Sequence, residues 1–273
     1  MKDFKMAICQ NKPSRDKQTS INKVESMISE AAGKGAQLVM LPEIFYHPYE
    51  LKEIPKLEEK NRKTINKLRE ASKQNKVYLC TGSTVEKEAG KRVNKSFLIS
   101  PQGEIILEYS KMHLFDVDFK ELRTRESLVF DSGDSINVVD TELGKIGIII
   151  CYDIRFPEVA RSLALQEVEI ILVPAAFNTT SGEAHWDIFS RCRAVENQVF
   201  LAAACPARDT KSQYVAYGHS RIIDPWGTVL AEAGLEEEII FADITNERLH
   251  EVRSRLPLLN HMKKDIYKKI LPY

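Results

Sequence analysis

The segment Lys145-Ile-Gly-Ile-Ile-Ile-Cys-Tyr-Asp-Ile-Arg-Phe-Pro-Glu158 is the part of the sequence that decides the fold. Its continuous apolar run, Ile146–Ile150, predicts a strand that is buried on both faces. Pro157 suits the first turn of a helix, and Glu158 is favoured beside the positive end of the helix dipole. A buried strand that leads through a short turn into a helix predicts an α/β protein.

Apolar runs of the same kind recur along the chain and alternate with helical patterns. Two turn signals, Pro101–Gly103 and Asp224–Gly227, favour hairpin connections, so the sheets are expected to be mixed. No linker or repeat divides the sequence, which predicts a single domain over residues 1–273. We predict strands at Met6–Cys9, Leu38–Leu41, Val77–Cys80, Phe97–Ile99, Ile105–Leu107, Ile146–Ile150, Ile170–Val173, Phe200–Cys205 and Ile239–Phe241.

The segments between these runs predict four amphipathic helices. Three are expected over Ser20–Ala32, around Leu57–Leu68 and from Pro157 onward. The tail from about Leu256 is basic and amphipathic, so it either packs against the body or crosses to a second subunit. The fourth helix is expected from about Ala184, with one apolar face formed by Phe189, Cys192, Val195 and Val199.

The composition excludes several classes of protein. Lysine plus arginine number 39 and aspartate plus glutamate also number 39, so the chain lacks the positive field that nonspecific binding to nucleic acid or an anionic membrane needs. The longest apolar run, near Val199–Cys205, is too short to cross a bilayer, and Met1–Cys9 does not resemble a secretory signal. Five cysteines without a Cys-x-x-Cys pair argue against a disulfide framework and a zinc site. We therefore expect a reduced, cytoplasmic protein without a bound metal.

Three polar residues follow predicted strands, where sites gather in α/β sheets: Glu43, Lys111 and Cys151. A thiol is a weak nucleophile until it is deprotonated, and a nearby ammonium lowers its pKa. A carboxylate can accept the thiol proton and later return it. The three would supply an activated nucleophile, a proton shuttle and a cation for an oxyanion, with the backbone N–H of Tyr152 as a second oxyanion donor.

Each of these residues also has an ordinary structural alternative. A cysteine after a buried strand is usually a core residue, as we expect for Cys9, Cys80 and Cys205. His113 lies two residues after Lys111, so a cysteine–histidine hydrolase is a second arrangement that the sequence allows. The simpler expectation is that His113 is a structural hydrogen-bonding partner.

The strings around the three residues are Leu41-Pro-Glu-Ile-Phe45, Tyr109-Ser-Lys-Met-His-Leu-Phe-Asp116 and Cys151-Tyr-Asp-Ile-Arg-Phe-Pro-Glu158. In this order they resemble the nitrilase superfamily, also called the carbon–nitrogen hydrolases, from about Phe4 to about Lys264. The resemblance implies a four-layer α-β-β-α sandwich with mixed sheets, no cofactor, and a homodimer in which two sandwiches meet. The helix after the third string and the tail are expected to help form the dimer interface.

Later strings are similar to the ω-amidase branch, whose members hydrolyse the side-chain amide of 2-oxoglutaramate or succinamate. One departure is Cys205, where members of that branch carry a small hydroxyl residue; it bears on fine specificity and not on the chemistry. The expected substrate is therefore a small amide that carries a carboxylate. The strings that support this branch are Phe177–Trp186, Arg193–Gln198, Pro206–Asp209 and Tyr217–Gly227.

The resemblance implies a role for each residue of the site. Cys151 would attack the amide carbonyl and carry a thioester, while Lys111 and the Tyr152 N–H hold the oxyanion. Glu43 would take the thiol proton, pass it to the leaving ammonia and then activate water.

A second glutamate supports the lysine in this family. Glu126 matches that position, in a long loop of the kind that is often functional, and Glu121 is the second choice. A lysine between two carboxylates is expected to stay protonated, because opposite charges nearby favour the charged form.

The substrate-binding residues are expected around the nucleophile. A guanidinium is the best planar match for a free carboxylate, which makes Arg155 a candidate, with a structural ion pair as the alternative. Aromatic residues would wall a small pocket, with ordinary core packing as the alternative for each, and polar residues after a strand would bind the polar end of the substrate. These candidates are Tyr46, Tyr49, Phe115, Phe177, Asn178 and Thr179.

Three other functions are compatible with the sequence. Within the same superfamily, the alternatives are a deaminated-glutathione amidase and an N-carbamoyl amine amidase. Outside the enzymes, the alternative is a catalytically idle family member that serves as a binding or assembly subunit. Such a chain should have lost at least one of Glu43, Lys111 or Cys151, and this one retains all three.

Overall fold

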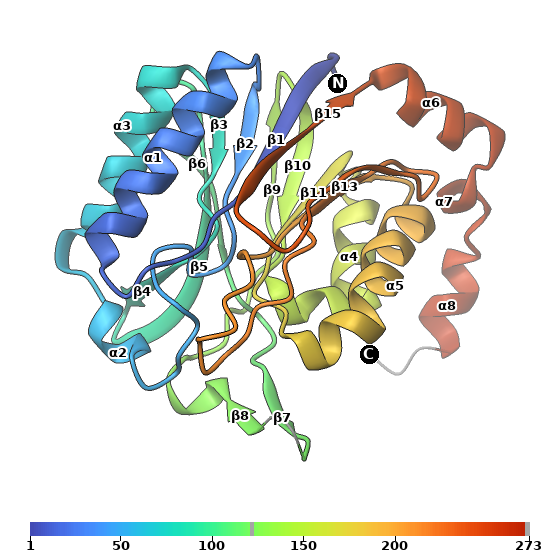
Figure 1. The fold of residues 1–273 in the computed structure, drawn as a ribbon. Helices are drawn as coiled ribbons and strands as arrows, with labels where there is room; N and C mark the ends of the chain where they lie inside the picture. The colour runs from blue at the N-terminus through green and yellow to red at the C-terminus, as the bar shows by residue number, and fades with distance from the viewer. Residues whose placement is uncertain (121–122, 271–273) are drawn as a thin grey trace.

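The computed structural model describes residues 1–120 and 123–270, and within these ranges the chain forms two large mixed sheets and a small hairpin (Figure 1). The strands are β1 (Phe4–Gln10), β2 (Leu38–Met40), β3 (Tyr78–Cys80), β4 (Thr84–Glu88), β5 (Lys91–Ile99), β6 (Ile105–Ser110), β7 (Asp116–Asp118), β8 (Arg123–Arg125), β9 (Val138–Thr141), β10 (Gly144–Ile148), β11 (Ile170–Pro174), β12 (Phe200–Ala204), β13 (Arg221–Ile223), β14 (Val229–Glu232) and β15 (Glu238–Ile244). The α-helices are α1 (Lys17–Gly33), α2 (Ile54–Leu57), α3 (Lys63–Asn75), α4 (Pro157–Leu165), α5 (Thr179–Asn197), α6 (Asn246–Arg255), α7 (Leu258–His261) and α8 (Lys264–Ile270).

Each large sheet combines parallel and antiparallel strands. The first has the order β15-β1-β2-β3-β5-β4, with β6 paired to β5, and the second has the order β14-β13-β12-β11-β10-β9. Strands β1, β2 and β3 are parallel, as are β10, β11 and β12, while the flanking strands are antiparallel. The prediction of mixed sheets is therefore confirmed, and hairpins occur at both predicted turns.

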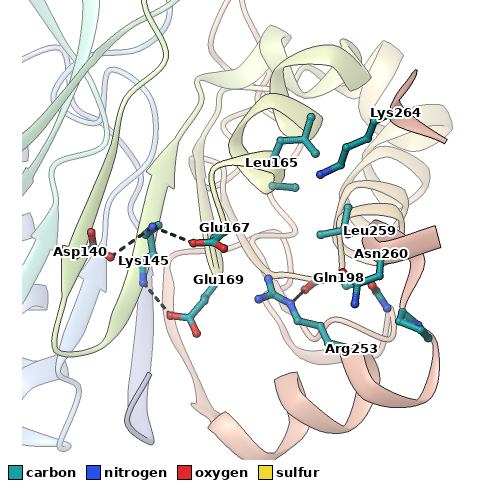
Figure 2. A pocket seen from close by; sticks show the side chains of 12 residues that line it. Asp140, Lys145, Leu165, Glu167, Glu169, Gln198, Arg253, Leu259, Asn260 and Lys264 are labelled. Carbon is teal, nitrogen blue, oxygen red and sulfur yellow. Dashed lines mark hydrogen bonds and ion pairs between the residues drawn. The ribbon is translucent and has the colours of Figure 1, made fainter. Parts of the chain in front are cut away.

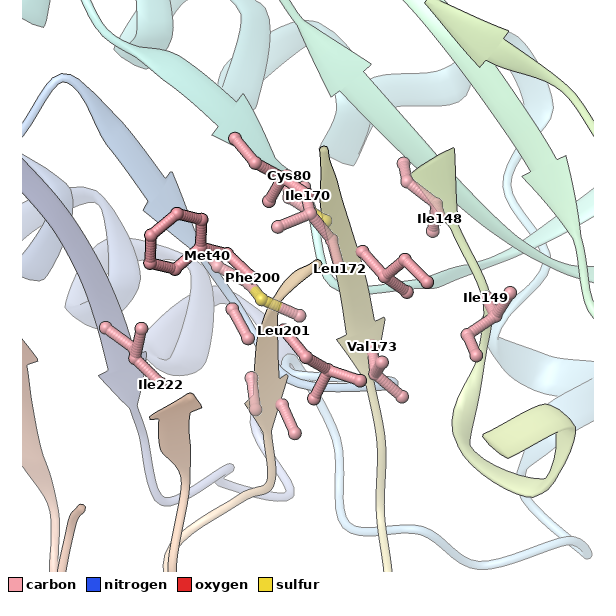
Figure 3. Close-up of a cluster of buried hydrophobic side chains, with 14 of the residues drawn as sticks. Met40, Cys80, Ile148, Ile149, Ile170, Leu172, Val173, Phe200, Leu201 and Ile222 are labelled. Carbon is pink, nitrogen blue, oxygen red and sulfur yellow. The ribbon is translucent and has the colours of Figure 1, made fainter. Parts of the chain in front are cut away.

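The two sheets lie between two layers of helices. Helices α1 and α3 cover the outer face of the first sheet, and α4 and α5 cover the second (Figure 1). Along β1, Met6 and Ile8 pack into one core cluster while Ala7 and Cys9 pack into the other, which explains why the run is apolar at every position. Figure 3 shows side chains of both sheets, Met40 and Phe200 among them, in a shared core. The expected α/β sandwich is confirmed.

Two helix predictions need correction. The second predicted helix is divided into α2 and α3, because Asn61 and Arg62 adopt left-handed backbone angles, with φ of 67° and 49°. The fourth begins at Thr179 rather than near Ala184, because the Asn178 side chain accepts a hydrogen bond from the Ser181 N–H and caps the helix.

The predicted apolar face of the fourth helix is wrong at two of its four positions, whereas Phe189 and Val199 do pack against the core. Its buried side includes Trp186 and Arg193, whereas Cys192 and Val195 are exposed. Arg193 turns inward because its guanidinium donates to the backbone carbonyl oxygens of Ile154 and Arg155 at 2.8 and 3.1 Å. The contacts of one buried arginine thus outweigh the hydrophobic pattern.

The C-terminal tail runs along the outside of the helical layer. Helix α7 contacts α5, and α8 has no buried residue within 264–270 (Figure 1). In the described part of the chain, no helix has both the length and the apolar composition that a bilayer-spanning segment needs.

Candidate active site

Glu43, Lys111 and Cys151 follow strands β2, β6 and β10, and folding brings them together in the interior. The Lys111 ammonium lies 3.0 Å from Glu43 Oε1 and 2.8 Å from Glu126 Oε1. Cys151 lies close enough for its thiol to interact with the Glu43 carboxylate. The charges of Lys111 and Glu126 also affect the pKa of this thiol. Glu43 and Lys111 are 68 residues apart in sequence. The predicted constellation of acid, cation and thiol therefore exists in the fold.

Cys151 stands on a sharp turn between β10 and α4. Its φ is 48°, in the left-handed region that a residue with a side chain seldom adopts. A short 3₁₀ turn, Cys151–Arg155, follows at once and leads into Pro157. Such a strained strand–turn–helix unit presents the side chain at the strand end, which is the layout of a nucleophile elbow.

The electrostatics of the site keep Lys111 charged. Burial alone would lower the pKa of the ammonium, but the carboxylates of Glu126 and Glu43 outweigh it, so the pKa lies well above 10.5. Burial raises the pKa of Glu43 above 4.5, Lys111 opposes this, and Glu126 adds to it. Two buried carboxylates thus share one cation, which makes Glu43 a stronger proton acceptor than an exposed glutamate.

Lys111 lowers the pKa of the thiol, as expected, but the net shift in the resting site is upward. Burial and the Glu43 carboxylate raise the pKa of Cys151 well above 9.0, and Lys111 only partly offsets them. The resting sulfur therefore carries its proton. Glu43 can take that proton as the sulfur attacks, so the thiol needs a general base and not a standing thiolate.

Glu126 connects the cation to the pocket wall. Besides Lys111, it accepts hydrogen bonds from the Tyr49 hydroxyl and, at 2.9 Å, from the Phe115 N–H. It is buried, and it contacts the lysine that we predict it to support. The second choice, Glu121, lies outside the described residues.

These observations agree with comparisons to known proteins. A model of the carbon–nitrogen hydrolase family matches residues 5–254. This chain belongs to the carbon–nitrogen hydrolases. It is 41% identical over 269 residues to Omega-amidase NIT2 of Homo sapiens and to that of Mus musculus, and the alignment covers 98% of this chain and 98% of each relative.

Solved structures of the nitrilase superfamily have the same fold as this carbon–nitrogen hydrolase. Saccharomyces cerevisiae Nit3, a member of branch 10 of that superfamily, has a TM-score of 0.88 and 33% identity, over 96% of this chain and 97% of its own. The C. elegans NitFhit protein has a TM-score of 0.89 and 29% identity, over 98% of this chain and 66% of its own. The chain is therefore a hydrolase of carbon–nitrogen bonds with the nitrilase fold.

Arg155 of this hydrolase is a partly buried guanidinium without an acidic partner in the described part of the chain. Its nearest polar contact is His185 Nδ1, 3.0 Å from Nη1, and its Nε has no hydrogen-bond partner among residues 1–120 and 123–270. The guanidinium lies over the rings of Phe177 and Phe189, 4.8 and 5.1 Å from their centroids. The expected alternative, a structural ion pair, is not present among the described residues.

Phe115 and Tyr49, two other predicted pocket residues, each pack against a second aromatic ring. Phe115 packs edge-on against the Tyr152 ring with centroids 5.0 Å apart, and Tyr49 packs against Tyr214 at 5.2 Å. The side-chain oxygen of Asn178 caps α5. The buried Nδ2 of the same side chain has no hydrogen-bond partner within the described residues.

The sequence analysis missed two residues of the site. Asn94 on β5 donates from its side-chain Nδ2 to Glu43 Oε1 at 2.7 Å. Its backbone carbonyl oxygen accepts from the backbone N–H of Lys111 at 2.8 Å. Tyr214 is partly buried, and its hydroxyl donates to the Ala176 carbonyl oxygen. Asn94 lies in Val93-Asn-Lys-Ser96, before the run Phe97–Ile99 that was predicted as a strand, and no local pattern marks it.

Cys205 lies behind the pocket wall. Its Sγ is 3.6 Å from the Phe177 carbonyl oxygen, and burial raises its pKa to about 12. The thiol is therefore neutral, and it contacts the pocket wall at the Phe177 carbonyl. Within the described residues, no group of three or more His, Cys, Asp or Glu side chains could hold a metal ion.

Two cavities differ in their relation to the site. One of about 540 Å³ lies under the tail, between Lys145 and Arg253, and none of the residues that line it belongs to the site (Figure 2). The other, of about 20 Å³, is lined by Glu43, Tyr49 and Tyr214 among others. It has room for about one water molecule beside the acid.

Proposed function

We propose that this protein is an ω-amidase that releases ammonia from 2-oxoglutaramate or succinamate through a thioester on Cys151. The similarity to Omega-amidase NIT2 over 98% of both chains carries this proposal. Arg155, four residues after the nucleophile, adds to it: this guanidinium has no acidic partner among the described residues, and a monoamide of a dicarboxylic acid brings a carboxylate.

The proposed reaction has two halves that use the same groups. Glu43 takes the thiol proton as the sulfur of Cys151 attacks the amide carbonyl, and the Lys111 ammonium and the Tyr152 N–H hold the oxyanion. Glu43 then gives its proton to the leaving nitrogen, which departs as ammonia. In the second half, water loses a proton to Glu43 and attacks the thioester, and the proton returns to the sulfur as the acid leaves.

Hydrolysis of a substrate panel, followed by the carboxylic acid or amine that each amide releases, tests the proposal. We expect turnover of succinamate and 2-oxoglutaramate at kcat/KM values at least tenfold above those of deaminated glutathione and an N-carbamoyl amine. Turnover of deaminated glutathione alone would assign the protein to that amidase instead. No turnover of any amide, by a folded protein, would favour an idle subunit.

Arg155 is expected to bind the distal carboxylate of the substrate. Arg155→Lys keeps the charge but loses the planar pair of donors, so KM for succinamate should rise about 10- to 100-fold with kcat little changed. Steady-state kinetics with succinamate and with the neutral amide butyramide check this.

Two comparisons make the Arg155 test specific. The kinetics of butyramide should change less than about threefold in Arg155→Lys, because that amide has no carboxylate. Arg253→Lys is the matched control, since Arg253 is also partly buried but donates only to backbone carbonyls, of Gln198 and Val168. Equal losses for both amides would show that Arg155 acts on the fold and not on the carboxylate.

The acid side of the pH profile should report Glu43. This carboxylate must be ionised to accept the thiol proton, and burial together with Glu126 raises its pKa above 4.5. We expect kcat/KM to fall as the pH drops through a midpoint above 4.5, in measurements from pH 4 to 8. Glu126→Gln removes one of the causes and should move that midpoint downward in the residual activity. A midpoint at or below 4.5 in the unaltered protein contradicts the assignment.

We further propose that the protein is a cytoplasmic homodimer. The described residues include five free cysteines, which suits a reducing compartment. Apolar side chains are exposed on the helical layer and the tail, and their burial against a second copy would remove them from water: Leu165, Ile188, Val195, Leu256 and Ile266. Sedimentation at micromolar concentration tests this, and a monomer would overturn it.

A further inference from the structure

Asp153 is a fully buried carboxylate two residues after the nucleophile, and the proposed reaction does not use it. Its Oδ2 accepts hydrogen bonds from the Ile150 N–H at 3.0 Å and the Tyr109 hydroxyl at 2.8 Å. Its Oδ1 lies 2.8 Å from both the backbone nitrogen and Nδ1 of His113. This confirms the expectation that His113 is a structural hydrogen-bonding partner. A buried carboxylate with four hydrogen-bond contacts to three residues is a fixed point of the fold.

These contacts join the two sheets at the active site. Tyr109 and His113 lie two residues before and two residues after Lys111, on the strand end of β6, which belongs to the first sheet. Asp153 follows β10 of the second sheet, as Cys151 does. Lys111 and the thiol therefore come from different sheets, and Asp153 ties the two strand ends together on both sides of the lysine.

Asp153 also closes the turn that carries the nucleophile. Its N–H donates to the Ile150 carbonyl oxygen at 3.1 Å, while its side chain accepts from the Ile150 N–H at 3.0 Å. The turn is thus held from both sides around Cys151, whose φ of 48° needs such support. The peptide that carries the Tyr152 N–H lies inside this closed turn, so its direction is fixed as well.

We propose that Asp153 is a positioning residue that holds Lys111 and the Tyr152 N–H at the places where they meet the oxyanion formed on Cys151. The inference rests on the proposed amidase reaction. Burial and the Asp153 carboxylate raise the pKa of Tyr109 well above 10.0, so its hydroxyl remains a donor at every working pH. His113 adds a second tie, because its ring stacks on Phe156 with centroids 3.6 Å apart, and Phe156 immediately precedes α4.

The test is Asp153→Asn, which keeps the shape of the side chain but loses the charge. A displacement of about 1 Å at a reacting group costs on the order of 100-fold in rate, so kcat should fall by about that factor while KM changes less than threefold. The alkylation rate of Cys151 with iodoacetamide, followed by mass spectrometry, should fall at least tenfold. A purely structural residue would lower the thermal stability and leave both rates unchanged.

Asp224→Asn is the matched control. Asp224 is equally buried and accepts from two backbone N–H groups, of Trp226 and Thr228, and from Arg248, but it lies at the far hairpin of the second sheet. We expect this variant to lose stability with kcat and the Cys151 alkylation rate retained.

A second variant keeps the inference falsifiable if Asp153→Asn does not fold. Tyr109→Phe removes one hydrogen bond to Asp153 and should lower kcat several-fold with KM unchanged. Unchanged kcat and alkylation rates in the folded variants would overturn the role of Asp153. If the unaltered protein hydrolyses no amide, the proposed function fails, while the alkylation comparison still decides whether Asp153 positions the thiol.

Discussion

Cys151→Ala is expected to abolish amide hydrolysis, with a loss in kcat on the order of 10⁴-fold or more. The sulfur is the only atom of the site that forms a bond to the substrate in the proposed reaction, and a methyl group cannot replace it. Its thiol is buried beside Glu43 and Lys111, so the loss should come without rearrangement of those two groups. Ammonia release from succinamate measures the effect.

The same variant should remain folded, and this separates chemistry from stability. Its melting temperature should lie within a few degrees of that of the unaltered protein. Alanine is smaller than cysteine, and both residues must adopt the same backbone angle at this position. Cys192→Ala, which changes an exposed cysteine on α5, should keep full activity. Mass spectrometry after incubation with substrate should find an acyl adduct on the unaltered chain and none on Cys151→Ala. Residual turnover above one per cent in Cys151→Ala would exclude the thioester route.

Lys111→Met is expected to cost both activity and stability. The ammonium lies between Glu43 and Glu126, at 3.0 and 2.8 Å, and all three side chains are at most 2% exposed. Removing the cation leaves two buried carboxylates without a countercharge, which costs about 3–5 kcal/mol in the free energy of unfolding. The melting temperature should therefore fall by roughly 5–15 °C. Activity should fall on the order of 10²–10³-fold, because an oxyanion donor is lost.

The pH dependence of this destabilisation identifies its cause. The pKa of Lys111 lies well above 10.5 in the folded protein, so its stabilising contribution is fully present at neutral pH and is lost only as the pH rises through that raised value. In Lys111→Met the destabilisation should shrink as the pH falls, because the carboxylates then take up protons. Chemical denaturation at pH 5 and pH 8 measures the difference. An equal loss at both values would contradict the electrostatic explanation.

Lys95→Met is the control for this variant. Lys95 is also a buried lysine between two carboxylates, Glu88 and Glu108, but those partners are 36% and 39% exposed. Water can solvate them when the cation is removed, so the loss of stability should be smaller. Lys95 lies on β5 away from Cys151, and activity should be retained.

Local patterns in the sequence were enough to predict the buried strands and the residues that carry the chemistry. The apolar runs at 38–41 and 146–150 became buried strands because burial on both faces leaves a continuous pattern that needs no knowledge of the partner strand. Glu43, Lys111 and Cys151 were found because each follows such a strand, and Glu126 because its motif matched. These features are local, and local features are written in consecutive residues.

The contacts and the protonation of these residues depend on the packed fold. Asn94, Tyr214 and Asp153 join the site through contacts between segments that are distant in sequence, and nothing near them in the chain marks the pairing. The raised pKa of Cys151 is likewise the sum of burial and several charges, so the lowering by the neighbouring lysine does not by itself give the net direction of the shift. Register between sheets and the exclusion of water depend on the whole packed core, and this is the physical reason why sequence identifies the reacting groups while the fold sets their protonation and alignment.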